Sequence, residues 1–529
     1  MKAFTIVSLA AVGALALTAC GGGSGSTPND SGGEPVIDGT LTAAISRDPG
    51  LLFQPLNPSS ALGAVSTWAY ERLVYFDTEG QPQGWLAESW EQTPTSLHFV
   101  VRDDAVCSDG TKLTAETIAN NFRWIADPAN SSTALGTVVP ADATIEHDDT
   151  SVTITTEKPD PFMITAVGSQ TIYCQAALDD PQSVATSTNG TGPFVMTEAV
   201  TGDHYSFERR DDYTWGPKGA PTGETPGYPK NVVVKIVENE STRANLLLSG
   251  DLNIAAIAGP DEERVADKVD LLSKNTLISG GILYSQAEGQ PTTDKNVRIA
   301  LTKALNLDEL MQVSTAGKGE RAPRLAVAKP QVCQYDAATP NLPKTDIAGA
   351  EKLLDAAGWV KGADGKRAKD GTPLVLEFAW QTRGAEIAAT AEMMAEQWAE
   401  IGVGTNHLGA EYGAFIERIS TPGAASELDV IWLAANLPVP NSLMPYFSGP
   451  SPDKGNNFAA LSNPEFDKLV AEANTHTGDE ACNAWEVAEA EMYSSADYVP
   501  FAVAFESTYS QGTASHEIDE LYTSLILVK

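Results

Sequence analysis

The sequence predicts an α/β protein whose mixed sheets are divided between two packed units. The first observation is length, because a chain of 529 residues is too long for one ordinary hydrophobic core. The second is pattern, because segments typical of strands alternate along the chain with amphipathic segments typical of helices. The composition agrees, since 42% hydrophobic and 20% charged residues are typical of soluble globular proteins.

The chain is strongly acidic. It has 34 Lys and Arg residues against 70 Asp and Glu residues, which gives a formal net charge of -36. A surface of this charge repels phosphate backbones and anionic lipid headgroups. We therefore expect no nucleic acid among the partners of this protein.

The N-terminus has the pattern of a secretory signal peptide over residues 1–20. Lys2 precedes a short apolar run, and small residues lead to Cys20 and three glycines. A cysteine at the cleavage site matches the bacterial lipobox, so we expect Cys20 to be diacylated and to anchor the protein to the membrane. The alternative is a chance cysteine near an ordinary cleavage site. Residues 21–38, rich in Gly, Ser, Asn, Asp and Pro, are expected to form a flexible linker.

The first unit is expected to begin after this linker and to contain most of the strands. A strand is predicted at 41–45, and a helix that turns into a strand at 68–76. Thr114 is predicted to cap a helix, because the apolar residues that follow it share one helical face. Further elements are predicted as strands at 97–102, 151–156, 204–209 and 232–237 and a helix at 243–248.

The chain is expected to cross into a second unit near 277–285, and this unit is richer in helix. Asn463, followed by a proline, is predicted to cap a helix. The other predicted elements are helices at 297–305, 348–357 and 386–400 and a strand at 374–380. Two final strands, near 499–505 and 522–527, are expected to return to the first unit.

The stretch from Leu428 to Phe447 joins an apolar run, residues 430–435, to a segment with three prolines. One interpretation is a core strand followed by a surface crossover. The other is a buried strand that leads into a ligand-binding loop, as in many α/β proteins. The pattern alone favours the first interpretation.

Four cysteines follow Cys20, and an even number in an exported chain favours disulfides. Of the three possible pairings we expect Cys107–Cys174 and Cys333–Cys482, because each bond then stays inside one predicted unit. The alternative is four buried free thiols. No two cysteines lie close enough in sequence for a zinc knuckle.

Motifs of catalysis are not found in the sequence. It contains no GxSxG, HExxH or Walker motif, and the glycine-rich turn at 190–194 lacks the lysine and helix pattern of a phosphate-binding loop. The six histidines are widely separated. We therefore expect no enzyme activity, no cofactor and no metal site, and we interpret the chain as a binding protein.

Several short motifs resemble those of bacterial extracytoplasmic solute-binding proteins of the peptide/nickel class, which serve ABC importers. They are WAYERL from Trp68, WLAESWE from Trp85, SDGTKLTAET from Ser108, GTGPF from Gly190, ERRDDY from Glu208, VRIAL from Val297 and AEKLLDAAGW from Ala350. They occur in the order of the family, and the resemblance covers about residues 40–527.

The resemblance implies a periplasmic-binding-protein-like fold with two lobes, a hinge between them and ligand trapped in the cleft. Lobe 1 would cover 39–278 with an extra subdomain at about 61–188, lobe 2 would cover 279–503, and 504–529 would return to lobe 1. It also implies a monomer on the extracytoplasmic face of the cell membrane, which delivers a peptide-like solute to the permease subunits of an ABC importer.

The resemblance also indicates the ligand-binding residues. A ligand-facing loop aligns with Gly63, Ala64 and Val65, and an arginine that binds the ligand carboxylate aligns with Arg383. The wall of the cleft would include Trp432, Leu433, Ala435 and Asn436.

Ala435 stands where the family's W-x-x-D pattern has an aspartate for the ligand ammonium. Either another acid, such as Glu427 or Asp429, reaches the site, or the ligand lacks that ammonium. The alternatives for function are therefore a blocked peptide, a metal chelate, a sugar or a glycolipid fragment as ligand, or a non-transport envelope lipoprotein.

Overall fold

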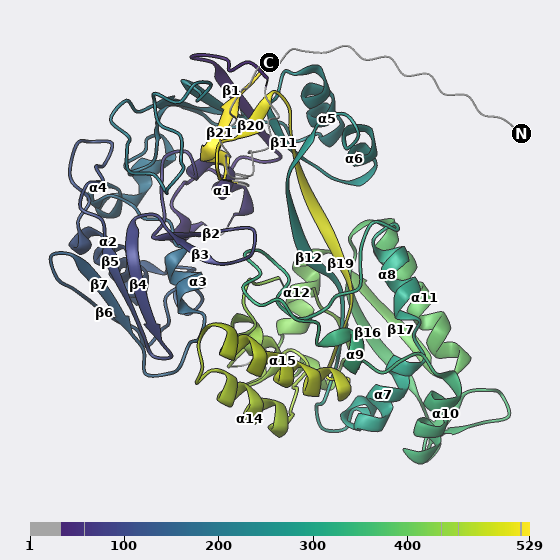
Figure 1. Ribbon diagram of the computed structural model, residues 1–529. Helices are drawn as coiled ribbons and strands as arrows, with labels where there is room; N and C mark the ends of the chain where they lie inside the picture. Colours follow the sequence, from purple (N-terminus) through teal and green to yellow (C-terminus); the bar gives the residue numbers. More distant parts are fainter. Residues whose placement is uncertain (1–32, 58, 435, 453, 519–520) are drawn as a thin grey trace, which may run out of the picture.

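The computed structural model describes residues 33–57, 59–434, 436–452, 454–518 and 521–529. Figure 1 shows two lobes with two long strands running between them through the middle of the molecule. We call the residues before and after these two strands lobe 1, and the residues between them lobe 2. Cys20 and Ala435 lie outside the described residues, so the structure does not bear on the predictions made for them.

The two crossover strands are β12 (Asp270–Tyr284) and β19 (Tyr498–Ser510), and they pair antiparallel along their length. Their register shifts near Gly280 and Gly281, which lie so close to aromatic side chains of β19 that a β-carbon at either position would overlap them. Such irregularities bend a strand pair. The expected lobe boundaries at 278/279 and 503/504 fall at Ile278 and Val503, which are directly paired.

Lobe 1 contains one half of a large sheet. The strands are β1 (Thr40–Ile45), β8 (Phe194–Val200), β9 (His204–Arg209), β10 (Asn231–Ile236) and β11 (Ile254–Ile257). The first strand, β1, lies between β10 and β11 and is parallel to both. On the far side of β10, the antiparallel strands β9 and β8 extend the sheet to its edge. The helices are α1 (Ser60–Ser66), α5 (Glu240–Ser249) and α6 (Gly259–Val265), and the C-terminal hairpin is β20 (Thr513–Ser515) and β21 (Leu525–Leu527).

A second, smaller sheet with its own hydrophobic core is inserted between β1 and β8. It has the order β4 (Ala87–Thr93), β5 (Ser96–Val101), β7 (Ser151–Thr155) and β6 (Thr144–His147). The helices are α2 (Ala115–Ala126), α3 (Met163–Gly168) and α4 (Gln175–Asp179), and the small hairpin beside them is β2 (Val74–Phe76) and β3 (Pro82–Gly84). Thr114 caps α2 as predicted, since its hydroxyl accepts the backbone N–H of Thr117 at 3.1 Å.

Lobe 2 contains the other half of the large sheet and most of the helices. Its strands are β16 (Val375–Gln381), β17 (Gly404–Ala410) and β18 (Val430–Trp432), with the small sheet β13 (Val360–Lys361), β14 (Arg367–Lys369) and β15 (Thr372–Pro373). Its helices are α7 (Lys295–Lys303), α8 (Leu307–Ser314), α9 (Ala338–Asn341), α10 (Ile347–Ala356), α11 (Gly384–Glu400), α12 (Tyr412–Ser420), α13 (Met444–Phe447), α14 (Pro464–Ala473) and α15 (Gly478–Ser494). The complete strand order is β17-β16-β18-β12-β19-β11-β1-β10-β9-β8, so one mixed sheet passes through both lobes and the predicted fold class is confirmed.

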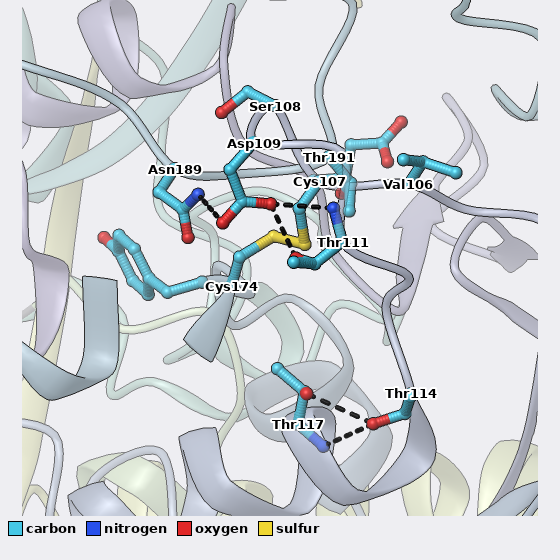
Figure 2. The surroundings of a disulfide bond; sticks show 12 residues. Val106, Cys107, Ser108, Asp109, Thr111, Thr114, Thr117, Cys174, Asn189 and Thr191 are labelled. Atoms are coloured by element: carbon cyan, nitrogen blue, oxygen red, sulfur yellow. Dashed lines mark hydrogen bonds between the residues drawn. A yellow bond between two sulfur atoms is a disulfide. The ribbon is translucent and has the colours of Figure 1, made fainter. Parts of the chain in front are cut away.

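One disulfide joins segments within each lobe. Cys107 bonds to Cys174 beside Asp109, which accepts hydrogen bonds from neighbouring residues (Figure 2). Cys333 bonds to Cys482 and so ties the segment after α8 to α15. The expected pairing is confirmed.

The segment at 68–76 differs from its prediction. The helix of this region, α1, ends at Ser66, and Trp68 and Leu73 are buried without helical structure. Glu71 instead forms a β-bridge with Ile172, which brings its side chain among buried donors of lobe 1. The prediction of a helix here was wrong because a contact across 101 residues of chain determines the backbone conformation.

Candidate functional site

A cavity of about 400 Å3, the lobe 1 cavity, lies at the carboxyl ends of the parallel strands β1 and β11. Carboxyl ends of parallel strands are a common ligand position in α/β proteins. The lining includes Ala64 of α1 and the paired residues Asn275 and Glu506 of the crossover strands. The cavity thus reaches the strands that join the lobes.

A second cavity of about 390 Å3, the lobe 2 cavity, lies at the carboxyl ends of the parallel strands β16 and β18. Its wall is mostly aromatic and aliphatic, with Ile387, Tyr412, Phe415, Ile416, Trp432, Leu433, Tyr446 and Phe458. Arg383, the N-cap residue of α11, is the only charged side chain among its described lining residues. An apolar wall with one cation suits a solute that has a bulky apolar group and an anionic group.

The two cavities lie along the same strand. Asn275 of β12 lines the lobe 1 cavity, and the carbonyl of Ser279 accepts the indole N–H of Trp432 from the lobe 2 cavity at 3.0 Å. Four residues of β-strand span about 13 Å. This separation is comparable to the length of a short extended peptide.

A third cavity of about 370 Å3, the side cavity, lies between the lobes. Its lining combines Gly63, Arg72 and Tyr75 of lobe 1 with the segment Lys329–Gln331 of lobe 2. Tyr522 lines both this cavity and the lobe 1 cavity, so the two adjoin.

The structure distributes the predicted loop residues over different environments. Gly63 lines the side cavity and Ala64 the lobe 1 cavity, whereas Val65 is fully buried in the core of lobe 1. A helix places successive side chains about 100° apart, so three consecutive residues of α1 cannot all face one cavity.

The predicted residues of lobe 2 are likewise divided. Arg383, Trp432 and Leu433 line the lobe 2 cavity. The side chain of Asn436 instead bonds the backbone of Ile278 at the bend of β12: its Oδ1 accepts the N–H at 2.5 Å, and its Nδ2 donates to the carbonyl at 3.1 Å. Asn436 thus fixes the position of its loop against the crossover strand.

Comparison with known proteins identifies the chain. The model of the bacterial extracellular solute-binding proteins, family 5 (Middle), matches residues 81–454. The chain belongs to this family. The family resemblance expected from the sequence motifs is therefore confirmed.

Several curated relatives are similar over most of their length. The oligopeptide-binding protein OppA of Bacillus subtilis is 24% identical over 511 residues, covering 90% of this chain and 89% of the relative. The heme-binding protein A of Haemophilus influenzae is 25% identical, covering 88% and 86%. The nickel-binding periplasmic protein of Escherichia coli is 26% identical, covering 69% and 70%. These family members are binding proteins rather than enzymes, in agreement with the prediction of no enzyme activity.

Solved structures show the same fold. The substrate-binding protein CtaP of Listeria monocytogenes superposes with a TM-score of 0.75 at 17% identity, covering 93% of this chain and all of CtaP. AppA of Bacillus subtilis, solved with a nonapeptide, gives a TM-score of 0.65 at 20% identity, with 94% and 100% covered. The two-lobe periplasmic-binding-protein-like fold is thus confirmed.

Two acids considered for the family's ammonium site, Glu427 and Asp429, do not line the cavities of the cleft. Both line a separate hollow near Trp359 and Pro373, at the opposite end of β18 from Trp432. Asp429 is 3% exposed and accepts the backbone N–H of Glu377 at 2.8 Å. Burial, with a smaller effect of the nearby Glu377 carboxylate, raises the pKa of Asp429 to about 6.

The sequence motifs and patterns did not identify three side chains that line the cavities. Tyr412 is 63% exposed on the wall of the lobe 2 cavity, Glu506 lies on β19 in the lobe 1 cavity, and Arg72 lies in the side cavity. Arg72 is part of the WAYERL motif, which was the available indication. No pattern in the sequence indicated Glu506 or Tyr412, because their positions in the cavities depend on how distant strands pair in the fold.

The described residues contain neither a membrane-spanning helix nor a cluster of metal ligands. None of their helices has the length and apolar character that a membrane span requires. Nor do three or more His, Cys, Asp or Glu side chains gather among them as metal ligands would.

Proposed function

We propose that this protein is the receptor of an ABC importer, which captures a peptide-like solute between its lobes and delivers it to the permease. The lobe 1 and lobe 2 cavities on either side of the hinge support this proposal, and in the second Arg383 forms no hydrogen bond or ion pair with a described residue. The names of the relatives, which include oligopeptide-binding proteins, agree with it.

An extended peptide would lie along the crossover strands, since strand-like backbone pairing does not depend on side chains. The guanidinium of Arg383 would bind the terminal carboxylate through a bidentate pair. A bulky apolar side chain would fit beside Tyr412 and Phe458. The ammonium would be balanced by Glu506, an acid that lines the lobe 1 cavity.

The direct test is native mass spectrometry of the purified full-length protein to identify the co-purified solute. Titration calorimetry with a random tripeptide library then measures its affinity for peptides. A peptide in the mass spectrum, together with binding in the micromolar range or tighter, is the expected result. A non-peptide solute and no peptide binding would overturn the peptide assignment.

A blocked or non-peptide solute is the second candidate, and two observations favour it. Ala435 occupies the position of the family's aspartate, and none of the described lining residues of the lobe 2 cavity is acidic. If a free peptide binds poorly for this reason, Ala435→Asp should strengthen binding of Ala-Ala-Phe relative to acetyl-Ala-Ala-Phe. If the ratio of the two affinities does not change, Ala435 does not determine the preference for a blocked peptide.

Lipid anchoring at Cys20 and a monomeric state are parts of the same proposal. Metabolic labelling with palmitate should mark the wild-type protein and not Cys20→Ala, and light scattering should give the mass of one chain. Deletion of the gene should abolish uptake of the identified solute. Normal uptake with an altered envelope would instead favour a non-transport lipoprotein.

A further inference from the structure

Two arginines differ from all the others in the described chain. Eleven other arginines donate side-chain hydrogen bonds, in most cases to a carboxylate or a backbone carbonyl, and Arg47 also has a partner. Arg72 and Arg383 form no hydrogen bond or ion pair with any described residue. Both line cavities of the cleft. In a chain with twice as many acids as bases, two unpaired guanidiniums at one cleft indicate positions kept for an anion.

Arg72 has not been assigned a role so far. Its side chain is solvent-accessible within the side cavity, between lobe 1 and the Lys329–Gln331 segment of lobe 2. Desolvation by the surrounding protein lowers the pKa of its guanidinium, and the smaller electrostatic effect of Tyr173 opposes this shift. A cation in such a position is stabilised when an anion enters the cavity.

The one acid among the described lining residues of the side cavity already accepts hydrogen bonds from its own loop. Asp77 lines the cavity, but its carboxylate accepts the side-chain amide of Gln83 at 2.8 Å and the backbone N–H of Gln81 at 2.8 Å. Aromatic side chains form much of the wall beside Arg72, with Tyr75 and Trp85 in an edge-to-face pair. The described lining therefore presents two cations, Arg72 and Lys329, to an anion, with aromatic surface beside them.

The backbone that carries Arg72 is fixed by its neighbour. Glu71 is fully buried and accepts the indole N–H of Trp85 at 2.7 Å, the hydroxyl of Tyr213 at 2.7 Å and the indole N–H of Trp215 at 3.1 Å. Because Glu71 is buried and Arg72 exposed, the two side chains lie on opposite sides of the chain. The hydrogen bonds of Glu71 fix the backbone on one side of the chain, and this holds the Arg72 guanidinium in place on the other side.

We propose that Arg72 binds a carboxylate of the solute in the side cavity, in addition to the anionic group bound at Arg383. This inference rests on the proposed function, and it specifies the solute as peptide-like with at least two anionic groups. The lobe 1 end of the solute then carries this carboxylate in addition to the ammonium that Glu506 balances.

The test uses two matched series of probes with the full-length protein: Glu-(Ala)n-Phe with one to four alanines, and the corresponding Gln-(Ala)n-Phe peptides. The two series have the same shape and the same N-terminal ammonium, and they differ by one carboxylate on the first side chain. Titration calorimetry should show that the wild type prefers the best Glu probe over its Gln partner by about tenfold to a hundredfold, as expected for a charge-assisted hydrogen bond. Arg72→Gln should abolish this preference, and Arg72→Lys should retain part of it.

The control is Arg264→Gln, which removes an exposed arginine of α6 far from the side cavity and should keep the preference unchanged. Thermal melting of each variant establishes that it is folded. Equal binding of the two series by the wild type, or a preference that survives in Arg72→Gln, would overturn the inference while leaving the solute-receptor function intact. Absence of binding to any probe would overturn the assignment of a peptide-like solute with two anionic groups, and the mass spectrum of the co-purified solute then decides the proposed function separately.

Discussion

Asp429→Asn is predicted to stabilise the protein at neutral pH and to have little effect near pH 4. Asp429 is 3% exposed, one of its oxygens accepts the Glu377 N–H, and the other has no hydrogen-bond partner in the described chain. Its pKa is raised from 3.8 to about 6. The native state therefore holds a proton between about pH 4 and pH 6 that the unfolded state has released.

The magnitude follows from this difference. A shift of about two pKa units corresponds to about 3 kcal/mol, which favours the folded state below the unfolded pKa and is lost as the pH rises through 6. The asparagine keeps an acceptor for the Glu377 N–H and carries no charge. The difference in unfolding free energy between the variant and the wild type should thus grow by about 3 kcal/mol from pH 4 to pH 7.5.

Urea denaturation at pH 4.0, 5.0 and 7.5 measures this difference, provided that the slopes of the two proteins agree. Glu88→Gln is the matched control, because Glu88 is exposed and its side chain forms no hydrogen bond or ion pair among the described residues. A variant less stable than the wild type at pH 7.5, or a stability difference independent of pH, would refute the reasoning.

Four further predictions concern ligand binding and stability. Arg383→Ala should weaken binding of Ala-Ala-Phe by about 1.5–3 kcal/mol and leave its C-terminal amide unaffected, as measured by calorimetry; equal effects on both would remove the arginine from the carboxylate site. Glu506→Gln should reduce the preference for Ala-Ala-Phe over acetyl-Ala-Ala-Phe about tenfold, and an unchanged ratio would show that the ammonium binds elsewhere. Replacing both Cys333 and Cys482 by serine should lower the unfolding free energy by about 5 kcal/mol in the chain-entropy model for a separation of 149 residues, and a loss below 1 kcal/mol would contradict that model. Glu71→Ala should cost about 3–5 kcal/mol, because it leaves the buried donors of Trp85 and Tyr213 without an acceptor, whereas Trp215 keeps the carbonyl of Thr191; urea denaturation that matches the wild type would show that water replaces the carboxylate.

Local patterns were sufficient for much of the fold. The apolar spacing after Thr114 places Ile118, Phe122 and Ile125 on one buried face of α2, as predicted. Asn463 caps α14, with its Oδ1 accepting the N–H of Phe466 at 3.1 Å. Such features depend on neighbours within one or two turns, so the sequence carries them directly.

The site depends on contacts between distant segments, and local patterns fail there. Asn436 was expected to face ligand, but its amide bonds the backbone of Ile278, 158 residues away. Glu506 lies in the lobe 1 cavity only because β19 pairs with β12 at Asn275. Neither pairing leaves a trace in the spacing of nearby residues.

The sequence by itself determined the α/β class, the family and the signal-peptide pattern, since these follow from composition and short motifs. The count of cysteines left three disulfide pairings open, and the division into two units favoured the one that the structure has. Only the tertiary structure decided which side chains share a cavity and which charges lack a partner. An arginine in a sequence is a cation with many potential acceptors. Whether it is neutralised, like Arg298 by Asp497 across 199 residues of chain, or left open, like Arg72, is determined by packing between segments that folding alone brings together.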